Sequence, residues 1–442
     1  MSRSDDLDGI DARRGRLSPE QRELLKRRLR GSAGASSAAE RIPQLRERDR
    51  SRLSFSQERL WFLHRLEPES RAYNIAIAFR FRGPLQVGAL SKALDAILER
   101  HESLRSVIEI RDDGNPVHRV TAQVPFALEP IPVSGEDDRD AASEAMRLAR
   151  ADACVPFKLE VGPLFRARLF ALGEADHIFY FAVHHIVFDG WSAGVFTKEL
   201  GFFYQAFSEG REPTLSEVAV QQMDFAHWER ERFARGAMAG DLRYWKKRLA
   251  GNLPTLELPV DHPRVANAPH RGKTRVFHLG PEVRGALEGF ARENGVTLFA
   301  VLLAAWNALF HRYTGQDEIV LGTGIADRTR TELEDTIGFF VSTVVLRSHV
   351  HGNPSFRALV ADASNTISEA QSHQAYPFGE LVKELHAEQG PGRAPLFQVM
   401  LVLNNTPVEA APFGQLEVEA IPVYSDGAKM ELVLSFMLAG DG

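Results

Sequence analysis

The sequence HIFYFAVHHIVFDGWS, residues 177–192, carries the clearest structural signal in the chain. From His177 to Val183 it is almost continuously apolar, which is typical of a strand buried on both faces. Two histidines end this strand, Asp189-Gly190 predicts a turn, and a helix is expected from about Ser192 to Phe207. The stretch therefore predicts a central strand whose polar end lies at the start of a helix, a common place for a functional site.

Strand and helix patterns alternate on both sides of this stretch. Alternating apolar residues predict a strand from Tyr73 to Phe81, and helical spacing predicts a helix after it. A charged, proline-bearing stretch from Trp228 to Arg275 indicates a crossing between two lobes. Beyond it we expect a helix at about residues 297–313, a strand at 319–323, a helix at 356–372 and a strand at 396–403. The predicted fold class is α/β, an α+β sandwich built as two lobes.

The length of the chain agrees with two lobes, because 442 residues exceed what one compact core usually serves. We expect a linker with a short helix over residues 1–49, an N-terminal lobe over 50–227 and a C-terminal lobe over 228–442. The C-terminal lobe is expected to be truncated before the last helix of the fold.

Composition narrows the class of protein. A net charge of −6 without a strongly basic block disfavours nucleic acid as a partner. The one cysteine, Cys154, predicts no internal disulfide, and the polar N-terminus lacks the apolar core of a secretory signal. No apolar run reaches the ~20 residues that cross a bilayer. The sequence thus predicts a cytoplasmic protein without a membrane span.

His184, His185 and Asp189 are the candidate chemical groups. A histidine with a pKa near 6.5 has a large neutral fraction at pH 7, so His185 is a candidate general base. Asp189 is predicted either to orient an imidazole or to pair with an arginine and hold the turn. Gly190 would permit a backbone conformation, or a close approach, that a β-carbon forbids. No metal is predicted, because zinc-ligand spacings are lacking and adjacent strand histidines point to opposite faces.

HHIVFDG, residues 184–190, resembles the HHxxxDG signature of nonribosomal peptide synthetase condensation domains, a branch of the chloramphenicol acetyltransferase-like acyltransferases. Six further stretches resemble motifs of that family in the same order: SFSQERLWFL (54–63), RHESLR (100–105), MDFAHW (223–228), IGFFVST (337–343), YPF (376–378) and PLFQ (395–398). The resemblance covers nearly the whole chain, and seven ordered motifs are far more specific than one.

The resemblance implies two chloramphenicol acetyltransferase-like lobes arranged in a V, with a tunnel between them and His185 near its middle. A donor and an acceptor carrier protein would deliver substrates as phosphopantetheine thioesters, next to a neighbouring adenylation domain. The amine on the acceptor carrier would attack the donor thioester to form an amide. The resemblance implies no cofactor bound by the domain itself, and His185 would be the catalytic residue.

The resemblance also implies roles for other residues. Asp189 would be structural and paired with an arginine, for which Arg328 and Arg347 are the candidates. The remaining motif residues would support the site: His184, Gly190, Trp191, Ser192, Arg100, His101, Arg105 and Ser342. At Ser342 the family most often has asparagine, so this chain keeps a polar group but changes its hydrogen bonding.

Two alternative functions stay open at this point. An epimerization domain shares the histidine motif, although VVLR at residues 344–347 resembles condensation domains more. A non-catalytic module that recruits another enzyme to a carrier-bound peptide is the second alternative, and the presence of His185 and Gly190 disfavours it.

Overall fold

The computed structural model describes residues 41–46, 48, 50–122, 126–135, 137–262, 272–386, 395–404 and 412–438. The short helix expected within residues 1–49 lies outside the described residues. Residues 44–442 form one compact unit, and the account below concerns its described part.

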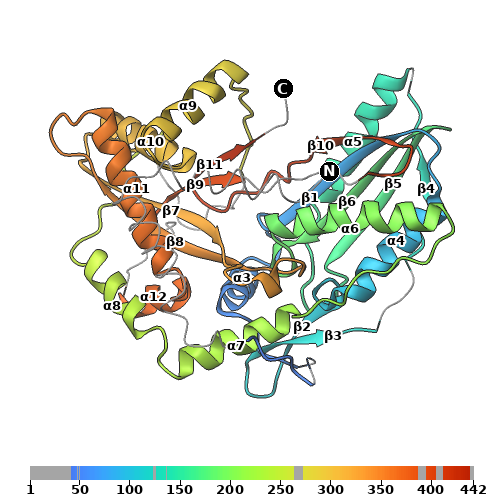
Figure 1. Ribbon diagram of the computed structural model, residues 1–442, viewed down its shortest axis with the longest axis horizontal. Helices are drawn as coiled ribbons and strands as arrows, with labels where there is room; N and C mark the ends of the chain where they lie inside the picture. Colours follow the sequence, from blue (N-terminus) through green and yellow to red (C-terminus); the bar gives the residue numbers. More distant parts are fainter. Residues whose placement is uncertain are drawn as a thin grey trace, which may run out of the picture. The chain divides into compact units, whose positions relative to one another are not determined.

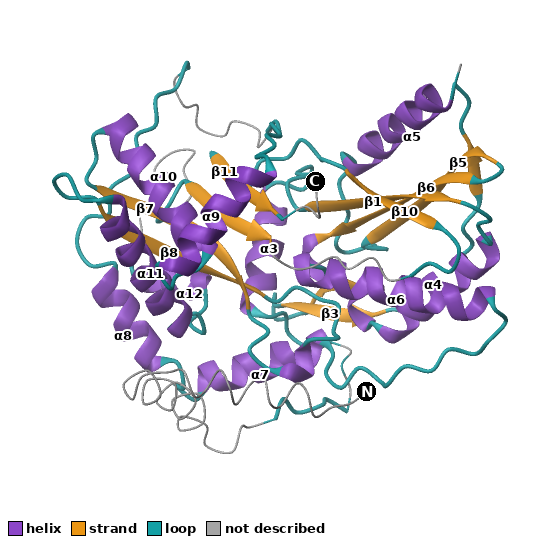
Figure 2. Ribbon diagram, turned by 45° about the horizontal axis from the view of Figure 1, so that its top comes forward, coloured by secondary structure: helices purple, strands orange, loops and turns teal. Residues whose placement is uncertain are grey.

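A five-stranded sheet organises the N-terminal half of the unit. Its order is β10 (Glu417–Pro422), β1 (Asn74–Arg82), β6 (Asp176–His184), β5 (Phe165–Gly173) and β4 (Pro130–Pro132). Every residue of β6 after Asp176 is buried, as its apolar sequence predicts. Figure 2 shows α5 (Asp138–Ala153) on one side of this sheet, with α4 (Val87–Arg100) and α6 (Gly190–Ser208) on the other. Helices on both faces explain why the central strand is apolar throughout.

A four-stranded sheet organises the second half. Its order is β11 (Leu432–Met437), β9 (Val399–Asn404), β7 (Glu318–Ala326) and β8 (Val341–His349). The pair β7 and β8 is antiparallel, whereas β9 runs parallel to both β7 and β11. The helices of this half are α9 (Pro281–Glu293), α10 (Leu298–Thr314), α11 (Phe356–Ser372) and α12 (Phe378–Glu384). Residues of this half form their own hydrophobic core, separate from the core around β6.

Several elements link the two halves. α8 (Ala239–Arg248) lies within the stretch expected as a crossing, whereas α7 (Gln222–Ala234) begins six residues before it, and α3 (Phe55–Leu66) precedes the first sheet. The hairpin of β2 (Ser106–Ile110) and β3 (Pro116–Val120) forms a small separate sheet.

Strand β10 comes from the C-terminal half of the chain yet pairs antiparallel with β1, with Phe79 opposite Ala420 (Figure 1). The second half of the sequence therefore completes the sheet of the first half, because β1 would otherwise be an open edge.

The expected elements agree closely with the observed ones. The structure confirms the mixed α/β class, and the helices predicted at 297–313 and 356–372 are α10 and α11. In the described residues, no single helix has the length and apolar character of a membrane span; only α9 and α10 taken together, bent by 105°, pass that test.

Gly322 in β7 offers a test of packing in the second sheet. A β-carbon there would lie 2.1 Å from the ring of Phe397, which is fully buried. We expect Gly322→Ala to lower the free energy of unfolding by about 1–3 kcal/mol or more, because the ring cannot move aside in a close-packed core. Urea unfolding followed by circular dichroism measures this difference.

Gly285→Ala is the matched control, since Gly285 lies within α9 and a β-carbon there meets nothing within 4 Å. That substitution should be neutral or stabilise the chain by up to about 1 kcal/mol. Equal effects of the two substitutions would contradict the packing argument.

Candidate active site around His185

The polar end of β6 holds His185 in one orientation. Its backbone N–H donates to the carbonyl of Tyr73, with the nitrogen and oxygen 2.8 Å apart, and a short 3₁₀ turn starts at this residue. The ring atom Nδ1 lies 2.7 Å from the carbonyl oxygen of Phe188. A carbonyl only accepts hydrogen bonds, so Nδ1 carries the proton and Nε2 keeps its lone pair. The local backbone thereby selects the tautomer in which Nε2 can accept a proton.

The surroundings of His185 keep its imidazole neutral. Burial lowers the pKa of His185 well below its usual value, and the positive charge of Lys429 lowers it further. The edge of the Phe339 ring packs against it, with centroids 4.9 Å apart. His185 is nevertheless only partly buried. A neutral, oriented and partly accessible imidazole can act as a proton acceptor or as a hydrogen-bonding group.

His184 has a different environment and a structural position. It is 3% exposed, its Nδ1 accepts the N–H of Ile186 at 3.1 Å, and aromatic rings of Tyr73 and Phe157 surround it. Burial lowers the pKa of His184 to about 3. It is therefore a neutral core residue that shapes the turn after β6.

Among the described residues, no hydrogen bond or ion pair joins Asp189 to an imidazole. Asp189 instead joins the end of β6 to the second half of the chain. Its carboxylate caps α6 by accepting the N–H of Ser192 at 2.8 Å and also accepts the N–H of Phe340 at 3.0 Å. The Ser192 hydroxyl lies 2.8 Å from the same carboxylate and accepts the N–H of Gly338 at 3.0 Å. Of the two roles that the sequence left open for Asp189, the geometry fits the structural one.

Arg328 is the arginine that pairs with Asp189. The Nη2 and Oδ1 atoms lie 3.2 Å apart, and both side chains are 1% exposed. Arg328 also donates to the carbonyl oxygens of Leu333 and Thr336, and burial lowers its pKa. Arg347, the other candidate, does not pair with Asp189. It forms an ion pair with Glu318 on the neighbouring strand β7 and donates to the carbonyls of Arg248 and Ala250.

The other motif residues hold the loop at residues 336–340 from its far side. His101 accepts the N–H of Ile337 through Nδ1 at 3.2 Å, and Ser103 donates to the carbonyl of Ile337 at 2.7 Å. Glu199 lies 2.8 Å from both His101 Nε2 and Arg100 Nε. The loop that presents Phe339 to His185 is thus fixed on one side by Asp189 and on the other by the RHESLR segment.

The remaining predicted residues lie around this centre. Arg105 donates to the carbonyls of Leu98 and Thr121, so it fixes local backbone. Trp191 donates through Nε1 to the carbonyl of Glu334 at 2.8 Å. Ser342 donates to Asp327 at 3.3 Å. None of these three contacts His185 in the described part of the chain.

Gly190 is exposed at the first turn of α6. Its φ is not positive, and a β-carbon there would meet only Asn404 Oδ1, at 4.0 Å. The backbone conformation therefore does not require glycine, and only the close approach of another group would.

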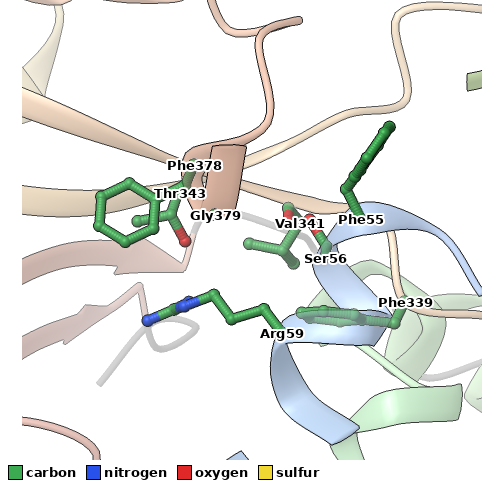
Figure 3. A pocket seen from close by; sticks show the side chains of 8 residues that line it. All are labelled: Phe55, Ser56, Arg59, Phe339, Val341, Thr343, Phe378 and Gly379. Atoms are coloured by element: carbon green, nitrogen blue, oxygen red, sulfur yellow. Dashed lines mark hydrogen bonds between the residues drawn. The ribbon is translucent and has the colours of Figure 1, made fainter. Parts of the chain in front are cut away.

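A small pocket lies next to this centre. Residues from α3, from β8 and the loop before it, and from α12 line it: Phe55, Ser56, Arg59, Phe339, Val341, Thr343, Phe378 and Gly379 (Figure 3). Phe339 is shared, because its ring lines the pocket and also packs against His185. Among the described residues, no group of three or more His, Cys, Asp or Glu side chains could hold a metal ion.

Tyr73, Phe339 and Lys429 are site residues that the sequence analysis did not identify as such. Tyr73 belongs to a strand pattern that predicts only burial, and Phe339 lies in the IGFFVST stretch, whose resemblance gave this ring no role of its own. Lys429 lies in a loop without periodic signal, so no pattern distinguished it from exposed lysines.

The condensation domain family matches residues 47–435, and the chain therefore belongs to that family. One component of the linear gramicidin synthase of Brevibacillus parabrevis is 43% identical over 353 residues, which are 80% of this chain and 7% of that protein. The chain thus spans a small part of the length of such relatives.

Solved structures share the fold. The X-domain from teicoplanin biosynthesis has a TM-score of 0.79 at 28% identity, covering 90% of this chain and 87% of that one. The first condensation domain of the calcium-dependent antibiotic synthetase has a TM-score of 0.74 at 24% identity, covering 88% of each chain. These findings confirm the predicted family and its chloramphenicol acetyltransferase-like fold.

The ion pair between Asp189 and Arg328 predicts a large stability effect. Asp189→Ala would leave a buried guanidinium without its carboxylate and α6 without its cap, so we expect a loss of about 3–5 kcal/mol and little soluble protein. Urea unfolding and soluble yield measure it. Asp189→Ala combined with Arg328→Met should recover part of the loss, because no buried charge is left unpaired.

Arg82→Met is the control, because that arginine makes exposed ion pairs with Glu417 and Glu419, which are worth about 1 kcal/mol or less. A stable, well-folded Asp189→Ala variant that fails only in turnover would contradict the structural role and favour direct participation.

Glu229 predicts a pH dependence of stability. Its carboxylate accepts the N–H of Phe55, and burial raises the pKa of Glu229 to about 7, with Asp327 adding to the effect. Because the folded pKa exceeds the unfolded value, the folded state binds the proton more tightly, and stability falls as pH rises from about 4.5 to about 7. We expect Glu229→Gln to match the parent near pH 5 and to exceed it by up to about 3 kcal/mol at pH 8.

Urea unfolding at pH 5, 6.5 and 8 measures this difference. Glu231→Gln on the exposed side of α7 is the control and should show no such trend. A difference that does not change with pH would show that Glu229 is not protonated in the folded state.

Proposed function

We propose that this domain catalyses amide formation between a donor acyl or peptidyl thioester and the amine of an aminoacyl thioester. Membership of the condensation domain family supports this activity. The observation that carries it is the hydrogen bond from His185 Nδ1 to the carbonyl of Phe188, because it leaves Nε2 free to accept a proton.

The chemistry needs little beyond alignment and proton removal, since a thioester is already an activated acyl group. The neutral acceptor amine attacks the thioester carbonyl, the C–N bond forms, and the carbonyl electron pair moves to oxygen. His185 Nε2 accepts the proton from the amine nitrogen or hydrogen-bonds it into position. The intermediate then collapses, the C–S bond breaks, and the thiolate leaves on the donor arm and takes up a proton.

Carrier proteins are the partners that we propose. Similarity to a component of linear gramicidin synthase supports a donor and an acceptor carrier, with an adenylation domain as a neighbour. Each phosphopantetheine arm would reach His185 along a passage through the domain. The pocket bounded by Phe339 supports one approach to this passage. The domain would bind no cofactor of its own.

His185→Ala tests the proposal. We expect amide formation between two loaded carrier proteins to fall at least about 10²-fold, because the group that receives or orients the amine proton is removed. Mass spectrometry of the acceptor carrier measures the product. Thermal unfolding should stay close to that of the parent, since the ring is only partly buried.

His351→Ala is the matched control, because that side chain is 72% exposed, and it should leave amide formation unchanged. Near-normal turnover by His185→Ala would contradict a catalytic role for this residue.

A recruiting module is the second candidate function. The X-domain that shares this fold has been solved in complex with OxyB, at 26% identity and a TM-score of 0.77. If this chain recruits a partner, it would bind a loaded carrier without forming an amide. An epimerization domain would instead invert the α-carbon of the residue on one carrier. Product analysis on the carriers separates the three outcomes.

A further inference from the structure

Lys429 lies over the ring of Tyr73, and Tyr73 is a neighbour of His185. Its Nζ atom is 5.4 Å from the centroid of the Tyr73 ring, and that ring is 6.5 Å from the ring of His185. The carbonyl of Tyr73 also accepts the backbone N–H of His185 at 2.8 Å. Tyr73 therefore fixes both the lysine and the histidine, which come from positions far apart in the sequence.

The segment that carries Lys429 is held by contacts from separate parts of the chain. Gly427 approaches Ala72 so closely that a β-carbon would lie 2.5 Å from its Cα. The carbonyl of Ser425 accepts the thiol of Cys154 at 3.3 Å, and the carbonyl of Asp426 accepts the N–H of Gly272 at 3.0 Å. The lysine is thus placed by tight backbone packing, unlike a lysine at the end of a free loop.

The charge of Lys429 has no counterion in the described part of the chain. Burial lowers its pKa to about 8, so the ammonium form still predominates at pH 7. Lys429 is partly buried. A partly desolvated positive charge without a carboxylate is unfavourable for stability, and such groups concentrate at functional sites. In such a site it can interact with negative charge that develops during a reaction.

We propose, building on the function above, that Lys429 is a second catalytic residue, whose ammonium donates a hydrogen bond to the donor thioester carbonyl oxygen as that oxygen becomes negative. As the C–N bond forms, the carbonyl electron pair moves to the oxygen facing Lys429, which keeps its proton. The proton of the attacking amine goes to His185. When the C–S bond breaks, the electron pair returns to the carbonyl. The ammonium would also disfavour a protonated acceptor amine nearby.

The test uses Lys429→Met and Lys429→Arg in the carrier-to-carrier assay. We expect Lys429→Met to lower kcat by about 10²–10³-fold, which is the effect of removing one donor to an oxyanion. The apparent affinity for the loaded carriers should change little, because the contact forms mainly in the transition state. Lys429→Arg should retain more activity than Lys429→Met. Lys383→Met is the matched control, since that lysine is 72% exposed and pairs with Glu380.

Chemical rescue separates a catalytic charge from a structural one. Cys154 is the one cysteine of the chain, so Cys154→Ser allows Lys429→Cys to be alkylated selectively. The same folded protein is treated with 2-bromoethylamine, which restores an amine, or with iodoacetamide, which adds a neutral group. We expect the amine to restore turnover at least tenfold over the neutral group.

Turnover of Lys429→Met within about threefold of the parent, or equal activity after the two treatments, would overturn only the role of Lys429. The proposed function would then still stand. A parent chain that binds loaded carriers but forms no amide would overturn the proposed function and this role with it.

Discussion

The buried ion pair between Asp189 and Arg328 is the interaction on which the site depends. Asp189 follows the histidines by four residues, caps α6, and binds the backbone of the loop at residues 336–340. That loop carries Phe339 against the ring of His185. A charge removed from water must be paired, so the turn after β6 and the loop of the second half hold one another in register. The position of the imidazole is consequently set by both halves of the molecule.

A backbone carbonyl, and not a carboxylate, selects the tautomer of His185. Because no carboxylate is hydrogen-bonded to Nδ1, the protonated form of the His185 ring is poorly stabilised here. The positive charge of Lys429 disfavours that form further. This electrostatic setting differs from that of a triad, in which a buried aspartate stabilises the charged ring. It suits a reaction of activated acyl groups, where alignment supplies much of the rate and a proton need reside on the ring only briefly.

Local patterns in the sequence predicted the central strand and most helices, because burial and period determine these features directly. Two histidines at the polar end of that strand made His185 a candidate base, and the family resemblance made it the catalytic residue. The resemblance left Asp189 with two candidate arginines, Arg328 in the loop after β7 and Arg347 in β8, because a motif does not show which of them approaches the carboxylate. Tertiary structure resolved this choice. Lys429 was not predicted, because its significance comes from Tyr73 and Ala72, more than 300 positions earlier in the chain. Such proximity has no local signature.

The pairing of β10 with β1 joins side chains 335 positions apart, Arg82 and Glu417. At roughly 10 residues per second on the ribosome, β1 emerges about half a minute before its neighbour exists. During that time the backbone N–H and C=O groups along this edge of β1 have no partner, and a strand of another chain could pair with them. A fragment that ends before Glu417 would lack β10, and its β1 edge would stay unpaired. The position at which a fragment ends therefore affects its tendency to aggregate.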